Sequence, residues 1–146
     1  MELPRELPYT NSNNTPVDYS KLPYDNFPKT VPPPIWGPTY WQIIHSFANS
    51  YPYNPTDSDK SAAKKFYTDL VNKLPCKTCG DSYAIFIQRM PIDNYLDNKD
   101  KLMWWTYKLH TIVNDKLRSQ GKPKAAEPTW TDFCKKYNSL CYSLNP

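Results

Sequence analysis

Two cysteines separated by two residues carry the clearest chemical signal in the sequence. They lie in the segment Leu74-Pro75-Cys76-Lys77-Thr78-Cys79-Gly80. Thiols at this spacing can close a disulfide where the backbone turns, and Pro75 fixes φ at the point where a helix would begin. Such a helix points unpaired N–H groups and the positive end of its dipole at the sulfurs, which favours thiolate over thiol. The pattern predicts redox chemistry; half of a zinc site and a pair of buried thiols remain as alternatives.

Two further stripes of residues place flat rings and hydrogen-bond donors at helical spacing. One consists of Gly37, Trp41 and His45, and the other of His110, Asn114 and Leu117 with Lys116 beside it. A single histidine or tryptophan on an apolar helix is more often an ordinary core residue. Together, the two stripes suit a large, flat, anionic ligand such as a flavin nucleotide, with Lys116 near its phosphates.

Apolar residues recur at helical spacing through the chain after residue 34. The pattern predicts helices over residues 39–51, 59–74, 76–89 and 103–118, and a shorter one that begins at Thr129. Gly37-Pro38 marks the expected start of the first, and the expected core stripe of the second is Ala62, Phe66, Leu70 and Leu74. The sequence has no convincing alternating strand, so a thioredoxin-like sheet around the cysteines is not expected. The predicted fold is all-α, a four-helix bundle with a short fifth helix.

Prolines dominate the beginning of the chain. The sequence has 16 prolines and only 3 glycines among 146 residues, and the prolines crowd the segment before residue 35. We expect an extended, partly polyproline II arm over residues 1–34 and one helical domain with a modest core over residues 35–146. The aromatic residues of the arm are candidates for packing on a surface or on another subunit, namely Tyr9, Tyr19, Tyr24 and Phe27. A floppy leader is the alternative.

Charge and hydropathy narrow the classes of partner. The net charge is +4, and lysines are interspersed with acidic residues, as in Asp57-Ser58-Asp59-Lys60, which indicates a solvated surface rather than a nucleic-acid site. No segment approaches the roughly 18 apolar residues that a membrane-spanning helix needs. The N-terminus lacks the charged and then apolar pattern of a secretory signal. These features predict a soluble protein made in the cytosol, with no membrane span and no nucleic-acid partner.

Four segments in a fixed order are more specific than any one of them alone. They are Trp36–His45, Tyr51-Pro52, Cys76–Cys79 and His110–Leu117. Together they closely resemble the Erv/ALR family of FAD-linked sulfhydryl oxidases, over residues 35 to about 140. The short domain and the Trp104-Trp105 pair resemble the versions encoded by large cytoplasmic DNA viruses.

The resemblance implies a fold, an activity and partners. The fold would be a four-helix FAD-binding bundle with a short fifth helix, usually found as a homodimer. The enzyme would take two electrons from a dithiol and pass them through FAD to oxygen, which gives a disulfide and hydrogen peroxide. The implied substrate is a thioredoxin-like or other dithiol protein, which the sequence does not identify further. The viral likeness implies the host cytoplasm, with the virion as a second location.

The resemblance also assigns site residues. Cys79 would be the thiol next to the flavin, and Cys76 would exchange disulfides with the substrate. The residues expected to bind FAD are Trp36, Gly37, Trp41, His45 and Tyr51, then His110, Val113, Asn114, Lys116 and Leu117 in the fourth helix, and Trp130 near the adenine. No metal site is implied.

The chain departs from the family pattern in its other cysteines. Many cellular relatives have a structural cysteine and an asparagine where this chain has Tyr107 and Thr111, so their structural disulfide cannot form in the same way. Cys134 and Cys141 are the remaining pair. On one helix they would be about 10.5 Å apart along the axis, too far for a disulfide unless the helix breaks between them. We expect a closed pair to staple the fifth helix; a mobile shuttle pair is the alternative.

Two other classes of function stay open at this stage. One is a zinc-stabilised helical interaction module that uses the four cysteines or a histidine. The other is a structural protein of a virion that keeps the bundle without oxidase activity. A yellow flavoprotein would exclude the first, and thiol oxidase activity would exclude the second.

Overall fold

The computed structural model describes residues 18–137. Its elements are α1 (Pro33–Asn49), α2 (Asp57–Lys73), α3 (Lys77–Arg89), the short 3₁₀ helix η1 (Ile92–Tyr95), α4 (Lys99–Ser119) and α5 (Trp130–Lys136). Within the described residues no strand is present, and one isolated β-bridge is the only extended pairing. These findings confirm the predicted all-α class with four main helices and a short fifth one.

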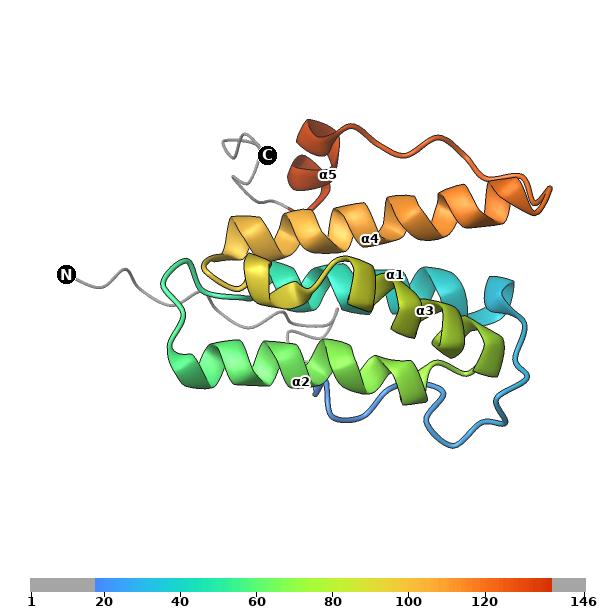
Figure 1. The fold of residues 1–146 in the computed structure, drawn as a ribbon, viewed down its shortest axis with the longest axis horizontal. Coiled ribbons are helices and arrows are strands. Elements are labelled where there is room, and N and C mark those ends of the chain that lie inside the picture. Colours follow the sequence, from blue (N-terminus) through green and yellow to red (C-terminus); the bar gives the residue numbers. More distant parts are fainter. Residues whose placement is uncertain (1–17, 138–146) are drawn as a thin grey trace.

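The four long helices lie side by side, and each runs opposite to the one before it in the chain (Figure 1). α1 packs on α4, α2 packs on α3, and η1 contacts α4. After α4 the chain returns along that helix, so that α5 lies over α4 (Figure 1). The arrangement brings the first turns of α3 close to the segment that precedes α1.

The expected start of α1 at Gly37-Pro38 is wrong. The helix begins six residues earlier than Thr39, with Pro33 and Pro34 in its first turn and Pro38 inside it. Prolines are tolerated in a first turn, where the N–H has no helical partner. Pro38 has no N–H, so one helical hydrogen bond is missing inside α1. Burial of Trp36 in the early turns offsets that loss: its side chain is 7% exposed, and its Nε1 donates to the Val31 carbonyl oxygen at 2.8 Å.

The other helices follow the prediction with shifts at their first turns. α2 begins two residues early because Thr56 and Asp59 form a capping box, and α4 begins four residues early with Asn98 as its N-cap. The expected core stripe of α2 is partly wrong, since Ala62 is exposed and Ala63 is fully buried. The buried face of α2 is rotated from the expected one because the Tyr67 ring is buried and its hydroxyl donates to the Ile44 carbonyl oxygen at 2.7 Å.

The core is centred on α4. Leu102, Met103, Trp105 and Leu109 are 0% exposed, and each such burial contributes roughly 1.5–3 kcal/mol. The Trp105 ring meets the Tyr67 ring edge-on at 5.0 Å. α4 is therefore held on the rest of the bundle along its first half, and its second half carries the predicted polar stripe.

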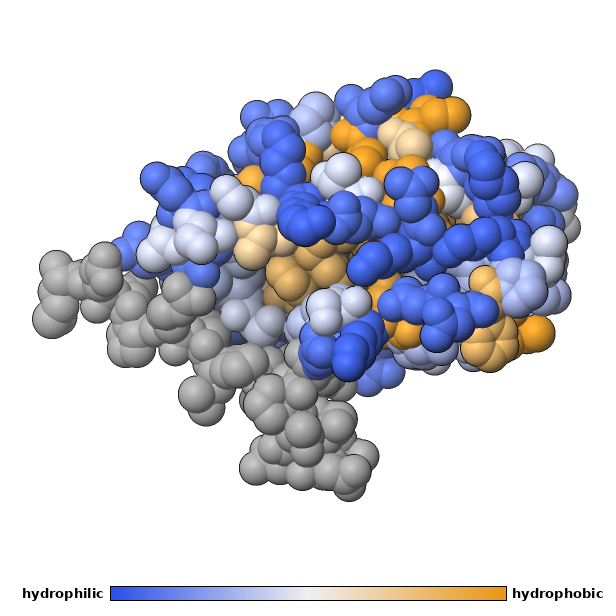
Figure 2. Space-filling view, turned by 90° about the horizontal axis from the view of Figure 1, so that it is seen from below, coloured by the Kyte–Doolittle hydropathy of each residue, from blue (hydrophilic) through white to orange (hydrophobic). Residues whose placement is uncertain are grey.

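The surface is mainly hydrophilic on the face shown in Figure 2, with apolar residues in separate patches. The large apolar side chains that are most exposed are Phe27, Ile35 and Ile85. Scattered exposure of this kind is ordinary for a folded protein. Among residues 18–137, no helix is long and apolar enough to cross a membrane.

Candidate functional site

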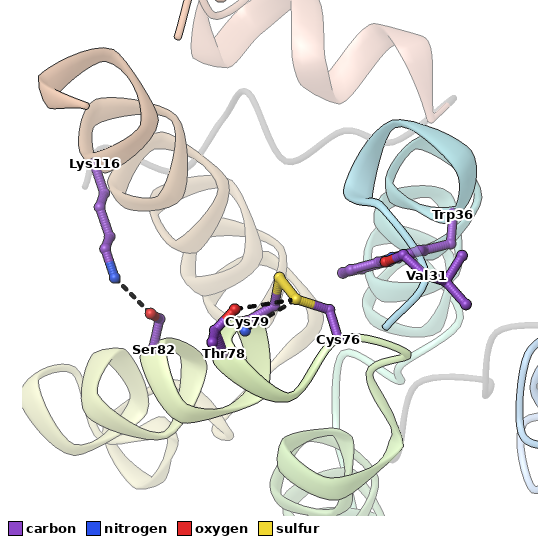
Figure 3. The surroundings of a disulfide bond; sticks show 7 residues. All are labelled: Val31, Trp36, Cys76, Thr78, Cys79, Ser82 and Lys116. Atoms are coloured by element: carbon purple, nitrogen blue, oxygen red, sulfur yellow. Dashed lines mark hydrogen bonds between the residues drawn. A yellow bond between two sulfur atoms is a disulfide. The ribbon is translucent and has the colours of Figure 1, made fainter. Parts of the chain in front are cut away.

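Cys76 and Cys79 form a disulfide at the start of α3, with their Cα atoms 5.2 Å apart (Figure 3). The two sulfurs are bonded to each other, so they do not form a pair of zinc thiolates. In the part of the chain that the structure describes, no three His, Cys, Asp or Glu side chains gather as metal ligands. The arrangement is one that can accept two electrons and become a dithiol.

Local structure explains why the sulfurs sit where they do. Pro75 has no N–H to continue α2, and Cys76 becomes the N-cap of α3. The Cys79 N–H donates to the Cys76 sulfur at 3.3 Å, and Thr78 Oγ1 lies 3.4 Å from the same sulfur. Donors at this position stabilise negative charge on sulfur, as the sequence analysis predicted for the start of a helix.

Gly80 lets α3 pack closely on α2 beside the disulfide. A Cβ added at this residue would collide with the carbonyl oxygen of Val71. That carbonyl has no helical donor, because the residue four positions later is Pro75. This close approach sets the distance between the first turn of α3 and the last turns of α2.

The segment before α1 also contacts the redox pair. Thr30 and Cys76 form the isolated antiparallel bridge, and Val31 and Trp36 lie next to the disulfide in Figure 3. Sequence reasoning missed this contact, because backbone pairing of two or three residues leaves no pattern of residue types.

The predicted ring stripes of α1 and α4 come together. The rings of Trp41 and His110 stack with centroids 3.8 Å apart and planes 11° apart. His45 Nε2 lies 3.3 Å from His110 Nδ1, within hydrogen-bond distance. The rings of Phe133 on α5 and of Tyr137, which follows that helix, approach His45 edge-on at 4.8 and 5.6 Å.

Both histidines are neutral at pH 7. Burial, with His110 as a second cause, lowers the pKa of His45 well below its ordinary value. Burial lowers the pKa of His110 to about 4, partly opposed by Glu127. Nδ1 of His45 is buried and has no hydrogen-bond partner among the described residues. A buried ring nitrogen of this kind needs a partner, which a bound ligand can supply.

The remaining predicted residues of α4 point in two directions. Lys116 donates to Ser82 Oγ on α3, and its Nζ lies 5.6 Å from the centre of the Phe86 ring (Figure 3). Asn114 Nδ2 donates to Glu127 at 3.1 Å. Val113 and Leu117 are half-buried on the same helix.

Two polar partners on this side of the bundle were not predicted. Ser82 stands three residues after Cys79 on the same helix, so its spacing could have revealed it. Glu127, which also pairs with Arg118 at 2.9 Å, lies in an irregular connection and carries no periodic signal.

Four predicted residues lie around these groups. Trp36 is buried near the disulfide, and a Cβ added at Gly37 would have no heavy atom within 4 Å. The Tyr51 hydroxyl donates to the Leu96 carbonyl oxygen at 2.8 Å, which ties Tyr51 to the core. The Trp130 ring on α5 lies 5.7 Å from that of Phe133 with the planes 21° apart, and its Nε1 is buried with no hydrogen-bond partner in the described structure.

The α5 helix is anchored where the family pattern would have a disulfide. The Tyr107 hydroxyl donates to the Pro128 carbonyl oxygen at 2.7 Å, and its ring contacts those of Trp130 and Phe133. Cys134 is 0% exposed. Its predicted partner Cys141 lies outside the described residues, so the pairing stays a prediction.

The residues present fit a flavin nucleotide. Trp41, His45 and His110 offer flat surfaces, and the buried nitrogens of His45 and Trp130 need partners. The open space beside Gly37 leaves room for a ligand against the α1 backbone. Positive charge from Lys136 and Lys124 acts on His110, which suits a ligand that carries phosphates.

Known proteins with similar sequences share one description. The Erv1/Alr family model matches residues 38–135. One relative is the probable FAD-linked sulfhydryl oxidase R368 of Acanthamoeba polyphaga mimivirus. It is 35% identical over 83 residues, which are 56% of this chain and 58% of that protein. The FAD-linked sulfhydryl oxidase of African swine fever virus is 27% identical over 85 residues, 58% of this chain and 70% of that protein.

A solved structure agrees with the sequence comparisons. The crystal structure of the yeast Erv1 core matches with a TM-score of 0.64 and 27% identity, over 79% of this chain and 92% of that one. The predicted likeness to viral members is confirmed, although the matched segment spans little more than half of the mimivirus protein. Because the family model matches well over half of the chain and includes the cysteine pair and the Trp41, His45 and His110 rings, the chain belongs to the Erv1/Alr family.

Proposed function

We propose that this chain is an FAD-linked sulfhydryl oxidase. It converts two thiols of a substrate and one oxygen molecule into a disulfide and hydrogen peroxide. The observation that carries the proposal is the Cys76–Cys79 disulfide at the start of α3, in a bundle whose helices α1 and α4 bring the Trp41 and His110 rings into a stack. Family membership and the names of the relatives support the same reaction.

The protein's own cysteines perform the exchange with the substrate. A substrate thiolate attacks the Cys76 sulfur, the Cys76–Cys79 bond breaks, and Cys79 leaves as a thiolate. The second substrate thiolate then attacks the substrate sulfur of the mixed disulfide, which releases the oxidised substrate and leaves Cys76 reduced. The Cys79 N–H and the Thr78 hydroxyl stabilise the Cys76 thiolate that results.

The residues that would hold FAD are those of the two stripes and their neighbours. Trp41, His45 and His110 would contact its rings, and the open backbone at Gly37 would allow a close approach. Lys116 and Asn114 would exchange their present partners, Ser82 and Glu127, for polar groups of the cofactor. When bound, FAD supplies a two-electron acceptor that oxygen can reoxidise.

The neutral state of the histidines suits this role. Since both are buried and uncharged, they can line a ring without repelling the surrounding lysines. Each neutral imidazole offers one donor and one acceptor, so His45 can use its unpartnered Nδ1 toward a bound ligand.

The partners and the location are part of the same proposal. The substrate is a thioredoxin-like or other dithiol protein, and the enzyme is a homodimer that acts in the host cytoplasm, with the virion as a second location. The viral relatives support the host setting. The division into an arm, residues 1–34, and an oxidase domain, residues 35–146, is kept in the proposal with one change, because Pro33 and Pro34 are in the first turn of α1 and so belong to the domain.

The absorption spectrum of the purified protein tests the cofactor assignment. We expect the two visible bands of an oxidised flavin and release of FAD, identified by mass, when the protein is denatured. A colourless protein that contains zinc instead would overturn the proposal in favour of a metal-stabilised module.

A further inference from the structure

Two backbone hydrogen bonds join the segment before α1 to the peptide groups on either side of Cys76. The Val31 N–H donates to the Pro75 carbonyl oxygen at 2.9 Å. The Lys77 N–H donates to the Lys29 carbonyl oxygen at 3.0 Å. We call Lys29–Val31 the arm segment. It fastens the backbone immediately before and immediately after the cysteine that exchanges disulfides in the proposed reaction.

Cys76 is the residue at which the chain changes from extended to helical. Its φ and ψ are −151° and 113°, and α3 begins at the next residue. An N-cap residue must keep this extended conformation for its side chain to receive an N–H from the first turn of the helix. Here the Cys76 sulfur receives the Cys79 N–H and lies beside the Thr78 hydroxyl. The hydrogen bonds from the arm segment to the peptide groups on both sides of Cys76 therefore keep its sulfur next to the Cys79 N–H and the Thr78 hydroxyl.

The connection between α2 and α3 has few backbone groups that can hold Cys76 in this conformation by hydrogen bonds. Pro75 has no N–H, so its carbonyl is the one backbone group by which it can bond. The Lys77 N–H belongs to the first turn of α3 and has no acceptor within the helix. The arm segment satisfies both groups, and both lie next to Cys76.

We propose that the arm segment is a positioning element of the redox site. It keeps Cys76 in the N-cap conformation and so holds the reduced Cys76 as a reactive thiolate. This inference rests on the proposed role of Cys76 as the thiol that exchanges with the substrate. The arm acts through the backbone, so its effect depends on an N–H and a carbonyl rather than on the side chains of the arm.

The matched pair Val31→Pro and Val31→Ala separates the backbone bond from the side chain. Val31→Pro removes the N–H that bonds to Pro75 and keeps an aliphatic side chain of similar size. It also keeps the carbonyl that accepts from Trp36. Val31→Ala keeps the N–H and removes most of the half-buried side chain.

Both variants leave every charge around Cys76 in place. The charged residues nearest to Cys76 along the chain are Lys73 in α2 and Lys77 and Asp81 in α3, which pair at 2.6 Å; the arm segment carries Lys29, and Lys116 of α4 reaches Ser82 on α3. A difference between the two variants in the reactivity of Cys76 therefore reports its position rather than the local field.

The measurement is the rate at which iodoacetamide alkylates Cys76 in the reduced full-length protein between pH 5 and pH 10. Trypsin cleaves after Lys77, so mass spectrometry follows Cys76 and Cys79 on separate peptides. We expect Val31→Pro to raise the pKa of the Cys76 thiol by roughly one unit, about the worth of one charge-assisted hydrogen bond, and to slow alkylation at pH 7 several-fold. Thr78→Val, which removes a donor to the sulfur directly, should shift the profile in the same direction. Val31→Ala should match the wild type.

Equal profiles for Val31→Pro and the wild type, in proteins with the same helical circular dichroism, would overturn the inference. A second measurement does not depend on how the variants fold. In the wild-type protein, the amides of Val31 and Lys77 should exchange hydrogen more slowly than the amide of exposed Lys29, and rapid exchange at both would also overturn it. Neither measurement uses oxidase turnover, so failure of the arm's role is distinct from failure of the proposed function.

Discussion

Cys76 and Cys79 differ in their surroundings, and we expect different effects when each is changed. Cys79→Ser removes the thiolate assigned to reduce the flavin, so a dithiol should no longer bleach the flavin absorbance in a stopped-flow measurement. Cys76→Ser leaves Cys79 as a lone thiolate beside the flavin, and a weak band at long wavelength should develop above the Cys79 pKa. Each variant is the control for the other. Rapid bleaching in Cys79→Ser, or the long-wavelength band in that variant alone, would show that the order of the two thiols is reversed.

The two buried histidines predict a pH dependence of stability. The pKa of His110 is lowered from 6.5 to about 4, mainly by burial, so the unfolded chain binds a proton that the folded chain does not over that range. Stability is therefore fully present above pH 6.5 and is lost as the pH falls toward 4. From pH 7 to pH 5 His110 alone should lower the free energy of unfolding by about 2 kcal/mol, and His45 adds to that fall; urea denaturation measures the sum.

The variant His110→Gln should flatten this dependence. The chain has only 2 histidines, so the remaining slope between pH 7 and pH 5 would come mainly from His45. The carboxylates with lowered pKa values, such as Asp93 and Asp97, act at lower pH. An unchanged slope in His110→Gln would mean that His110 is not buried as described.

Site residues could be predicted where their side chains are of uncommon types, and could not be predicted where the contact is made by the backbone or by a residue in an irregular segment. Cysteine, histidine and tryptophan at helical spacing are uncommon enough to stand out, and the structure brings Trp41, His45 and His110 together. Glu127 and the arm segment could not be predicted in this way. Glu127 reaches Asn114 through tertiary structure, and the arm contacts Cys76 through backbone groups that every residue except proline carries.

At the scale of elements, two glycines in helices should respond in opposite ways to alanine. Gly80→Ala should lower the free energy of unfolding, because its Cβ collides with the Val71 carbonyl oxygen and α3 must move away from α2. Gly37→Ala meets no atom within 4 Å, so the gain in helix propensity, up to ~1 kcal/mol, should raise the stability of the protein without cofactor. Urea denaturation of both variants checks the signs.

The same pair of variants tests the site. If Gly37 lies against the cofactor, Gly37→Ala should weaken FAD retention even though it strengthens the helix. Gly80→Ala should disturb the disulfide first, since it lies beside Cys79. A stabilised Gly37→Ala protein that keeps FAD as tightly as the wild type would remove Gly37 from the site.

The double variant Cys134→Ser with Cys141→Ser tests how α5 is held. Cys134 is completely buried, which favours a staple over a mobile shuttle. We therefore expect a lower melting temperature, with oxidation of a small dithiol and of a protein dithiol reduced in step. Unchanged melting with loss of protein oxidation alone would identify a shuttle pair instead.

Helix starts were the least predictable feature of the elements. Gly37-Pro38 is typical of a helix boundary, yet α1 continues through it because Trp36 gains a buried position and a hydrogen bond. The start of α2 depends on the capping box at Thr56, whose pattern was present in the sequence but was overlooked. The centres of the four long helices were predictable, because their core stripes repeat over three or more turns. The seven residues of α5 make about two turns, and its N-cap Thr129 carried the signal instead.

At the scale of the whole molecule, the segment before α1 is part of the described fold. Leu22 is 7% exposed, and the Tyr19 ring packs edge-on against Phe47 and Phe66 at 5.1 and 5.5 Å. Composition predicted an extended arm with four aromatic residues as candidates for packing. Tyr19 and Tyr24 pack on the helices, Phe27 is 51% exposed, and Tyr9 lies outside the described residues. Where they would pack could not be predicted, because that depends on how α1 and α2 come together.

The all-α class and the family could be predicted from the sequence because helical periodicity and four ordered segments are long-range, redundant signals. The contacts that position the redox pair are few, local and made largely by the backbone. They depend on how closely α3 approaches the arm and α2, which no residue pattern encodes.

Oxygen consumption during the oxidation of a dithiol tests the central claim most directly. The full-length protein with bound FAD should consume one oxygen molecule and release one hydrogen peroxide for each pair of thiols lost, and Cys79→Ser should consume none. Lys65→Ala, an exposed change on α2, should match the wild type. A protein that holds FAD but consumes no oxygen with either small or protein dithiols would contradict the account and favour a structural role for the bundle.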